Sequence, residues 1–532
     1  MTVKIGVSGD AAEAVDRIVP QLVSDLVASR ITGGDATLWG DAAEAEASVR
    51  LGWVEAVGVS RPMVDDILAL RDRLHHAGIN HIVLGGMGGS SLAPEVITRT
   101  DGAALTVLDS TDPEQVLRAL NDRLATTAVV ISSKSGSTVE TDSQKRIYEE
   151  RFRAAGIDPT DRIVIVTDPG SPLDASAREA GYRVFNADPT VGGRYSALTA
   201  FGLVPSGLAG ADISALLDEA EATLLDLAID SPHNPGLVLG AAIAGTRPLR
   251  NKLAIVADGT HILGFGDWAE QLIAESTGKD GTGILPVVLG VNAPELQSRP
   301  DDLQVVRLVR DWDDTREVVH GEIEIAGTLG AQIMVWEYAT AVAGRLLGIN
   351  PFDQPDVESA KIATRALIDN PSEPAPAALV DGVVELRGTD DVIVGASGLN
   401  DAISALVAAV PADGYLSIQA YLDRPGHHEL EALRDLLAAR TGRPVTFGWG
   451  PRFLHSTGQF HKGGPAVGVF LQLVAATHPD LPIPGRPFAF GSLIRAQADG
   501  DASVLAAHGR PVLSLALTNV DEGISRVLAA SS

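Results

Sequence analysis

The chain has 532 residues, more than one ordinary hydrophobic core can organise, so two or three domains are expected. Its 69 acidic residues outnumber 41 basic ones, and the resulting net charge of −28 argues against nucleic acid or an anionic membrane as a partner. The sequence contains no cysteine, which excludes disulfides and thiolate chemistry, and neither a signal peptide nor an apolar run of about 18 residues is found, so a cytoplasmic protein is expected.

Two regions are distinguished in the first part of the chain. Residues 1–74 are predicted to be mostly helical, and 75–230 to form a first α/β domain. In the latter range short apolar runs alternate with amphipathic stretches, the pattern of a parallel sheet with helical crossovers. The expected strands are 81–84, 105–108, 128–131, 162–166 and 184–185.

The glycine-rich segment GGMGGSS (85–91) leaves the first of these strands and opens a helix. Glycines let the backbone approach an anion, and the free N–H groups of a helix N-terminus can then bind it. A dinucleotide fingerprint would need a glycine where Ser91 stands, although Asp109 after the next strand could mimic its acidic residue. The segment alone therefore allows a phosphate site, a nucleotide site or an ordinary tight turn.

The segment ISSKSGSTVET (131–141) gives a stronger signal for phosphate. It also leaves a strand and enters a helix, and it supplies four hydroxyls and one lysine within six residues. Hydroxyls, backbone N–H groups and one compact cation suit a phosphate monoester, whereas the P-loop pattern is absent. The competing interpretation is a hydroxyl-rich helix cap.

Arg194 lies between a glycine pair and an apolar helix start, in GGRYSALTAFG (192–202). An arginine in this place could neutralise a developing oxyanion. It could equally pair with a surface carboxylate, and the residues around it leave both alternatives open.

Residues 231–369 are predicted to form a second α/β domain, with strands at 253–257, 284–289 and 303–308 and a long helix at 330–347. In WAEQLIAESTGKDGTG (268–283), Gln271 and Glu275 are four residues apart and share one helix face. A carboxylate next to a carbonyl substrate can move a proton. A solvated helical glutamate is the alternative.

The segment FDQPDVESAK (352–361) places Gln354 and Lys361 seven residues apart, on one face of a helix. A Pro- and Ala-rich linker is expected at 370–379, and 380–532 is predicted to be a third α/β unit. Its expected strands are 391–394, 415–418 and 444–447. The polar turn HSTGQFHKGG (455–464) carries two histidines without a nearby carboxylate pattern, so no metal site is expected.

Taken together, these segments resemble the motifs of the glucose-6-phosphate isomerase family, in family order over roughly residues 75 to 365. The loop GGMGGSSLAP resembles the family's phosphate loop, SSKSGSTVET its second phosphate segment, and VGGRYSALTAFG one of its signatures. QLIAESTGK and INPFDQPDVESAK resemble the segments that carry its glutamate and its Gln…Lys pair.

The resemblance implies a role for each matching residue. The phosphate-binding residues would be Ser90, Ser133, Lys134, Ser135 and Thr138. Glu275 would be the catalytic base, Arg194 would stabilise the enediolate, and Lys361 would assist ring opening. Further substrate contacts would come from Gly89, Gln271 and Gln354.

The ring-opening histidine departs from the family pattern, in which it follows a Gly-Gln pair between the glutamate and Gln…Lys motifs. Here 282–350 contains only His320, in a strand-like segment. The counterpart is TGQFH, 100 residues after Lys361, in a segment similar to one in the isomerase portion of transaldolase–isomerase fusions. His461 is favoured over His455 because it follows the Gly-Gln pair.

The resemblance further implies two doubly wound parallel-sheet sugar-isomerase (SIS) domains, each an αβα sandwich, followed by the C-terminal α/β unit. It implies a homodimer in which the neighbouring subunit can supply the histidine, and it implies no metal or redox cofactor. The expected reaction is the interconversion of glucose 6-phosphate and fructose 6-phosphate in glycolysis and gluconeogenesis.

Three alternatives to this function are kept. A dual phosphoglucose/phosphomannose isomerase would share the enediolate chemistry and differ in handling at C2. A non-catalytic SIS module that senses sugar phosphate would keep the phosphate loops and lose the base, which the presence of Glu275 and Arg194 disfavours. A nucleotide-binding dehydrogenase is disfavoured by the missing third glycine.

Overall fold

The computed structural model describes residues 3–312, 317–369, 376–476 and 481–532. Its strands form three sheets, one in each predicted α/β unit. Most of the expected linker, 370–375, lies outside the described residues. The predicted α/β class is confirmed, because each sheet is rich in parallel strands joined by helices.

The first sheet is entirely parallel, in the order β3-β2-β4-β5-β6. Its strands are β2 (His81–Gly86), β3 (Leu105–Leu108), β4 (Thr127–Ser132), β5 (Ile163–Thr167) and β6 (Arg183–Asn186). Ile82 and Leu84 face one hydrophobic cluster whereas Val83 faces another, so helices cover both faces. The helices of this unit are α6 (Leu92–Asp101), α7 (Pro113–Asn121), α8 (Val139–Ala154), α9 (Pro172–Glu179), α10 (Ala200–Ala209) and α11 (Ile213–Ala228).

The second sheet has the order β1-β10-β9-β7-β8, parallel except for β1. Its strands are β1 (Val3–Val7), β7 (Lys252–Ala257), β8 (Leu285–Leu289), β9 (Leu303–Val309) and β10 (Glu322–Gly327). The N-terminal region therefore contains an edge strand as well as the helices predicted for 1–74. Those helices are α1 (Gly9–Ser24), α2 (Val27–Thr32), α3 (Asp41–Ala47), α4 (Ala56–Ser60) and α5 (Val64–His76).

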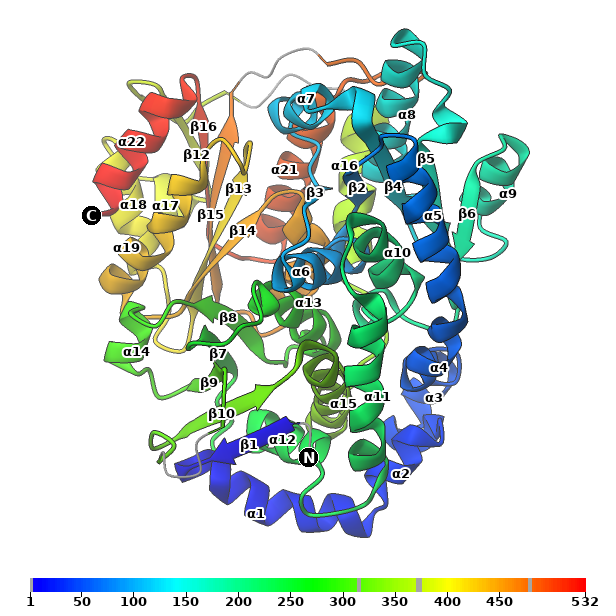
Figure 1. Ribbon diagram of the computed structural model, residues 1–532. Helices are drawn as coiled ribbons and strands as arrows, with labels where there is room; N and C mark the ends of the chain where they lie inside the picture. Colours follow the sequence, from blue (N-terminus) through cyan, green and yellow to red (C-terminus); the bar gives the residue numbers. More distant parts are fainter. Residues whose placement is uncertain (1–2, 313–316, 370–375, 477–480) are drawn as a thin grey trace.

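One face of the second sheet is covered by its own helices and the other largely by the C-terminal unit. The unit's helices are α12 (Pro235–Ala244), α13 (Phe265–Thr277), α14 (Pro294–Ser298), α15 (Leu329–Leu347) and α16 (Val357–Asp369). On the other face Ala254 and Val256 share a hydrophobic cluster with Tyr415, Phe460 and Phe470. Figure 1 shows the C-terminal unit, coloured yellow to red, lying against both preceding units.

The C-terminal sheet has the order β11-β12-β16-β15-β13-β14, with a parallel core of four strands. Its strands are β11 (Leu379–Asp381), β12 (Val384–Gly388), β13 (Tyr415–Tyr421), β14 (Val445–Trp449), β15 (Gly468–Ala475) and β16 (Val512–Leu517). Its helices are α17 (Asp390–Ile393), α18 (Leu399–Ala408), α19 (Ala432–Thr441), α20 (Gly458–Gly463), α21 (Phe490–Ala507) and α22 (Val520–Ser531). The strand predicted at 391–394 is wrong, because a short helix occupies most of it.

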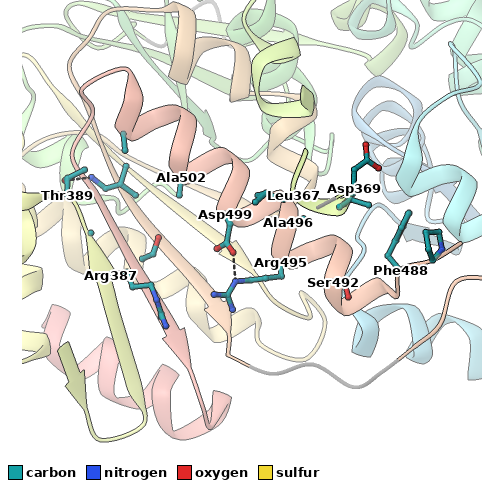
Figure 2. A pocket seen from close by; sticks show the side chains of 16 residues that line it. Leu367, Asp369, Arg387, Thr389, Phe488, Ser492, Arg495, Ala496, Asp499 and Ala502 are labelled. Carbon is teal, nitrogen blue, oxygen red and sulfur yellow. Dashed lines mark hydrogen bonds and ion pairs between the residues drawn. The ribbon is translucent and has the colours of Figure 1, made fainter. Parts of the chain in front are cut away.

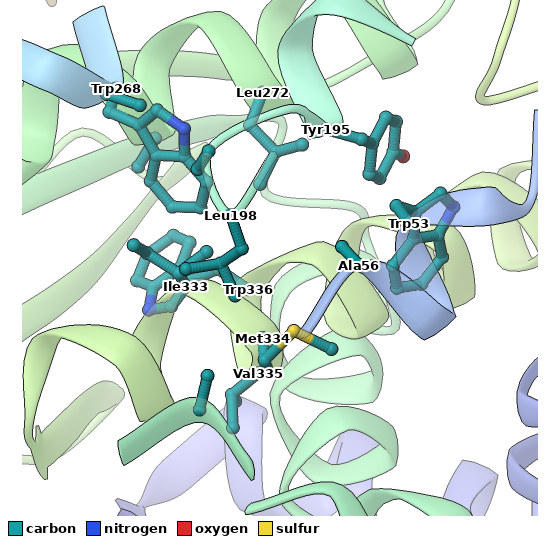
Figure 3. Close-up of a cluster of buried hydrophobic side chains, with 14 of the residues drawn as sticks. Trp53, Ala56, Tyr195, Leu198, Trp268, Leu272, Ile333, Met334, Val335 and Trp336 are labelled. Atoms are coloured by element: carbon teal, nitrogen blue, oxygen red, sulfur yellow. The ribbon is translucent and has the colours of Figure 1, made fainter. Parts of the chain in front are cut away.

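An aromatic core joins the first two units beneath the segments that carry the predicted catalytic residues. The Trp53 ring stacks on Tyr195 with ring centroids 5.2 Å apart, and Trp336 meets Phe265 edge-on at 5.5 Å. Figure 3 shows Trp268 and Leu272 of α13 pointing into this cluster. Because these buried side chains fix α13 and the segment around Tyr195, the polar groups on their other sides are held in a defined relation.

Candidate active site

Glu275 lies in the last turn of α13, which ends at Thr277 close to the predicted end at Gly278. Gln271, one turn earlier, donates from Nε2 to the Glu275 Oε2 atom at 3.2 Å and to the carbonyl of His455 at 2.7 Å. The Glu275 side chain keeps 13% of its surface exposed. The carboxylate is thus oriented by a neighbouring amide and remains partly exposed.

Arg194 is held beside this carboxylate by four hydrogen bonds. It donates to Ser276 Oγ at 2.8 Å, to Gln354 Oε1 at 2.8 Å, and to the carbonyls of Pro351 and Asp353 at 2.8 and 3.0 Å. Its Nη1 lies 3.7 Å from Glu275 Oε2, and its side chain is only 2% exposed. A fixed, buried guanidinium of this kind stabilises negative charge that develops next to it.

The first glycine loop packs directly on these groups. Gly89, in the short 3₁₀ turn Gly88–Ser90, lies so near Gly193 that a Cβ at Gly89 would overlap the Gly193 carbonyl. Gly88 has φ of +56°, and a Cβ there would lie 2.6 Å from the carbonyl oxygen of His455. Glycine is required at both positions because other segments of the site approach the backbone.

Lys279 is a site residue to which the sequence interpretation gave no role, although it stands in the QLIAESTGK motif. Its buried ammonium donates to the carbonyls of Asn350 and Asp353 at 2.7 and 2.6 Å and to Asp353 Oδ1 at 2.7 Å. Burial, together with the charge of Arg194, lowers the pKa of Lys279 to about 8. Lys279 and Arg194 together hold the loop that presents Gln354.

His455 comes from the 3₁₀ turn Arg452–His455 of the C-terminal unit and reaches the first unit. Its Nε2 lies 3.0 Å from Glu140 Oε1, and Gln497 Nε2 donates to the same oxygen at 2.7 Å. Burial alone would raise the pKa of Glu140, but the charge and hydrogen bond of His455 outweigh it, so that pKa is lowered. Glu140 also stands in a recognised motif, SSKSGSTVET, and no role had been predicted for it.

A cavity of about 580 Å³ lies beside His455, between the hydroxyl-rich loop and α16. Four of the predicted site residues line it: Ser135, Thr138, Lys361 and His455. Ser137 and residues of the first turn of α8 also line it. The cavity therefore brings together a helix N-terminus, three hydroxyl side chains, a lysine and a histidine.

Three predicted phosphate-binding residues do not line this cavity. Ser133 is buried and donates to Thr138 Oγ1 at 3.2 Å, so it supports the loop. Lys134 donates to Asp168 Oδ2 at 2.6 Å, so its charge is paired with a carboxylate that does not line the cavity. Ser90 is buried in the glycine loop next to Gly86.

The structure brings His455 to the site and does not bring His461, the histidine favoured from sequence. His461 is buried, with Nδ1 3.0 Å from the Tyr415 hydroxyl and its ring stacked on that of Tyr415 at 5.8 Å. Burial and the nearby Lys462 and Arg510 charges hold the pKa of His461 well below its usual range. Because α20 begins between the two histidines, they point to different parts of the molecule.

A larger cavity, of about 820 Å³, lies on the other side of α16 against α21 and the C-terminal sheet. Figure 2 shows its polar lining, in which Arg495 pairs with Asp499 at 2.8 Å. None of the predicted site residues lines it. Size alone therefore does not identify the functional cavity. The smaller one is the candidate for phosphate binding, whereas Glu275 and Arg194 are not among the residues that line it.

Over the described ranges, no helix is long and apolar enough to cross a membrane. The same residues contain no group of three histidine, aspartate or glutamate side chains that could hold a metal ion.

No family model matches the chain. It is 32% identical over 343 residues to a probable glucose-6-phosphate isomerase of Haloarcula marismortui, a match that covers 55% of this chain and 79% of that relative. The chain belongs to the glucose-6-phosphate isomerase family. A glucose-6-phosphate isomerase of Synechococcus sp. (strain JA-3-3Ab) is 36% identical, covering 53% of this chain and 65% of the relative.

Solved structures agree with this family at the level of the fold. A hypothetical protein from Thermus thermophilus superposes with a TM-score of 0.56 at 24% identity, covering 68% of this chain and 99% of that one. A glucose-6-phosphate isomerase from Chlamydia trachomatis gives a TM-score of 0.50 at 21% identity, covering 62% and 76%. The resemblance found in the motifs is thus confirmed for the family and its fold.

Proposed function

We propose that the chain interconverts glucose 6-phosphate and fructose 6-phosphate through a cis-enediolate. The observation that carries the proposal is the pairing of a partly exposed carboxylate, Glu275, with a buried guanidinium, Arg194, at 3.7 Å. A base beside a fixed cation is the arrangement needed to remove a proton next to a carbonyl and to stabilise the resulting oxyanion.

The 6-phosphate is assigned to the cavity wall made by the hydroxyl-rich loop. Ser135, Ser137 and Thr138 expose hydroxyls there, and the N-terminus of the 16-residue helix α8 adds the positive end of a helix dipole. Lys361 lies on the opposite wall. In a chain of net charge −28, such local donors and cations are what would hold an anionic substrate.

Two pairs of residues carry the two steps of the reaction, ring opening and proton transfer. His455, with Lys361, opens the pyranose ring: a proton reaches the ring oxygen while the anomeric hydroxyl loses its own. Glu275 next removes the proton at C2 and returns it to C1, and Arg194 stabilises the enediolate oxygen in between. Gln271 keeps the Glu275 carboxylate oriented through its 3.2 Å hydrogen bond.

The resemblance-based expectations of a homodimer and of a cytoplasmic location stay predictions. A neighbouring subunit is not needed to supply the histidine under this proposal, since His455 of the same chain contacts both Gln271 and Glu140. We therefore assign ring opening to His455 in cis.

The test is incubation of the purified protein with glucose 6-phosphate in D₂O, followed by NMR. We expect fructose 6-phosphate to form and deuterium to appear at C2 of the recovered glucose 6-phosphate. Tight binding without turnover would contradict the proposal and favour the sensing module. Parallel incubation with mannose 6-phosphate identifies a dual isomerase, because only that enzyme would turn it over at a comparable rate.

A further inference from the structure

One face of α21 supports the candidate site from the C-terminal unit. Gln497 and Asp501, four residues apart on this helix, are both buried. Asp501 pairs with Lys462 of α20 at 2.5 Å, and Gln497 donates to Glu140 at 2.7 Å. Glu140, the carboxylate that contacts His455, is therefore also contacted by α21, a helix that lies outside the recognised family motifs.

The amide of Gln497 has a defined orientation. Its Oε1 accepts a hydrogen bond of 2.6 Å from the hydroxyl of Thr111, which follows β3 in the first unit. If the amide were reversed, its oxygen would face the Glu140 carboxylate, and two acceptors would meet in a buried environment. Thr111 therefore fixes Gln497 so that its N–H is directed at Glu140.

Glu140 Oε1 receives both the Gln497 amide and the ring of His455. One carboxylate oxygen with two donors is stabilised in its ionised form. An ionised acceptor 3.0 Å from His455 Nε2 places the imidazole proton on Nε2 and restricts rotation of the ring. The orientation of His455 in the cavity consequently depends on Glu140 remaining charged and fixed.

We propose that Gln497 is a positioning residue for ring opening: with Thr111 it holds the Glu140 carboxylate and, through it, the tautomer and orientation of His455. The inference rests on the proposed function, since His455 is the residue assigned to ring opening. It adds that the C-terminal unit supplies both the histidine, from its 3₁₀ turn, and the amide that supports the histidine's partner.

The charged groups near this relay come from four helices. Glu140 belongs to α8, Lys361 of α16 lies close enough to favour its ionised form, and Lys462 of α20 is neutralised by Asp501 of α21. A new carboxylate at position 497 would face Glu140 directly. The proton that two such carboxylates would otherwise share is lost more easily when His455 is protonated, because the imidazolium stabilises both negative charges, so the substitution favours the protonated imidazole.

The test is Gln497→Glu, with ¹⁵N NMR of the imidazole assigned through loss of its signals in His455→Gln. We expect the imidazole titration of His455 to move to higher pH by about one unit or more and the pH profile of kcat to shift with it. Ser492→Glu is the matched control, because it adds the same charge at an exposed position of the same helix and should shift neither. Identical titration of His455 in Gln497→Glu and the wild type would overturn the proposal.

Thr111→Val provides a second, nearly isosteric probe if Gln497→Glu does not fold. It removes only the hydroxyl that orients Gln497, and it should change the His455 Nε2–H resonance and lower kcat with little effect on KM. An unchanged resonance in this variant would also refute the relay. Because the NMR readout needs no turnover, a shifted resonance in a protein without isomerase activity would refute the proposed function while leaving the positioning contact intact.

Discussion

At the residue scale, the sequence predicts the cluster around Glu275 and Arg194 better than the positions of the phosphate-loop residues and the histidine. Arg194, Gln271, Glu275 and Gln354 come together because each stands in a motif whose neighbours build the same contacts. His461, the histidine favoured from sequence, is buried in the structure. It was chosen because it follows a Gly-Gln pair, but that pair does not show which side of the six-residue helix α20 faces the cavity. That choice is made by the aromatic side chains around Tyr415.

The two histidines are therefore expected to respond differently to substitution. His455→Gln should lower glucose 6-phosphate turnover by about a hundredfold, as for loss of a general acid–base group, and should change the melting temperature little. His461→Gln should lower the melting temperature, because its ring packs on Tyr415, and leave kcat near the wild-type value. Steady-state kinetics and thermal melts decide, and the opposite pattern would return ring opening to His461.

At the element scale, most predicted strands are present, and the exceptions have local or long-range causes. The run around Val392 is apolar enough for a strand, yet Asp390 and Asp391 occupy the first turn of a helix, where its dipole favours acidic residues. Strand β1 pairs with β10, and most of the first two units lies between these strands in the sequence. Such pairing depends on tertiary structure, so the pattern of Val3–Val7 alone did not indicate it.

The long helix α15, predicted at 330–347, contains a buried carboxyl group with a consequence for stability. Burial raises the pKa of Glu337 well above its ordinary value, so the folded protein keeps a proton that the unfolded chain releases. This proton uptake makes the folded state progressively less stable as the pH rises above about 4.5, by up to about 1.4 kcal/mol per pH unit, until the raised pKa is reached.

Glu337→Gln removes this proton linkage while keeping the size of the side chain. We expect the free energy of unfolding of the variant, relative to the wild type, to increase between about pH 5 and about pH 8. Urea unfolding at both pH values measures it. Glu13→Gln, at an exposed position of α1, is the control and should show no such trend. A pH-independent difference for Glu337→Gln would mean that Glu337 is charged in the folded protein.

At the scale of the whole molecule, the C-terminal unit has two functions in the architecture. It covers one face of the second sheet, where Phe460 and Phe470 share a hydrophobic cluster with Val256. It also brings the Arg452–His455 turn to the first unit, where Arg452 contacts Glu95 at 2.6 Å and Asp109 at 2.9 Å. The sequence placed this unit after a linker but could not show that it completes the site, because contacts between units depend on tertiary packing.

A site completed within one chain predicts the result of a complementation experiment. Glu275→Gln and His455→Gln chains are each expected to be nearly inactive, and mixing them after unfolding and refolding together should restore nothing. If a neighbouring subunit supplied the histidine in a homodimer, mixed dimers would contain one intact site and would recover about a quarter of wild-type activity. Recovery of that size would contradict assignment of His455 in cis.

The most direct test of the proposed mechanism is Glu275→Gln assayed on fructose 6-phosphate. The amide keeps the size of the side chain and can still meet Gln271, but it cannot accept the C2 or C1 proton. The account predicts a loss of at least about a hundredfold in kcat with a folded protein and a KM close to the wild-type value. Near-normal turnover in this variant would contradict the assignment of Glu275 as the base and, with it, the enediolate mechanism proposed for this site.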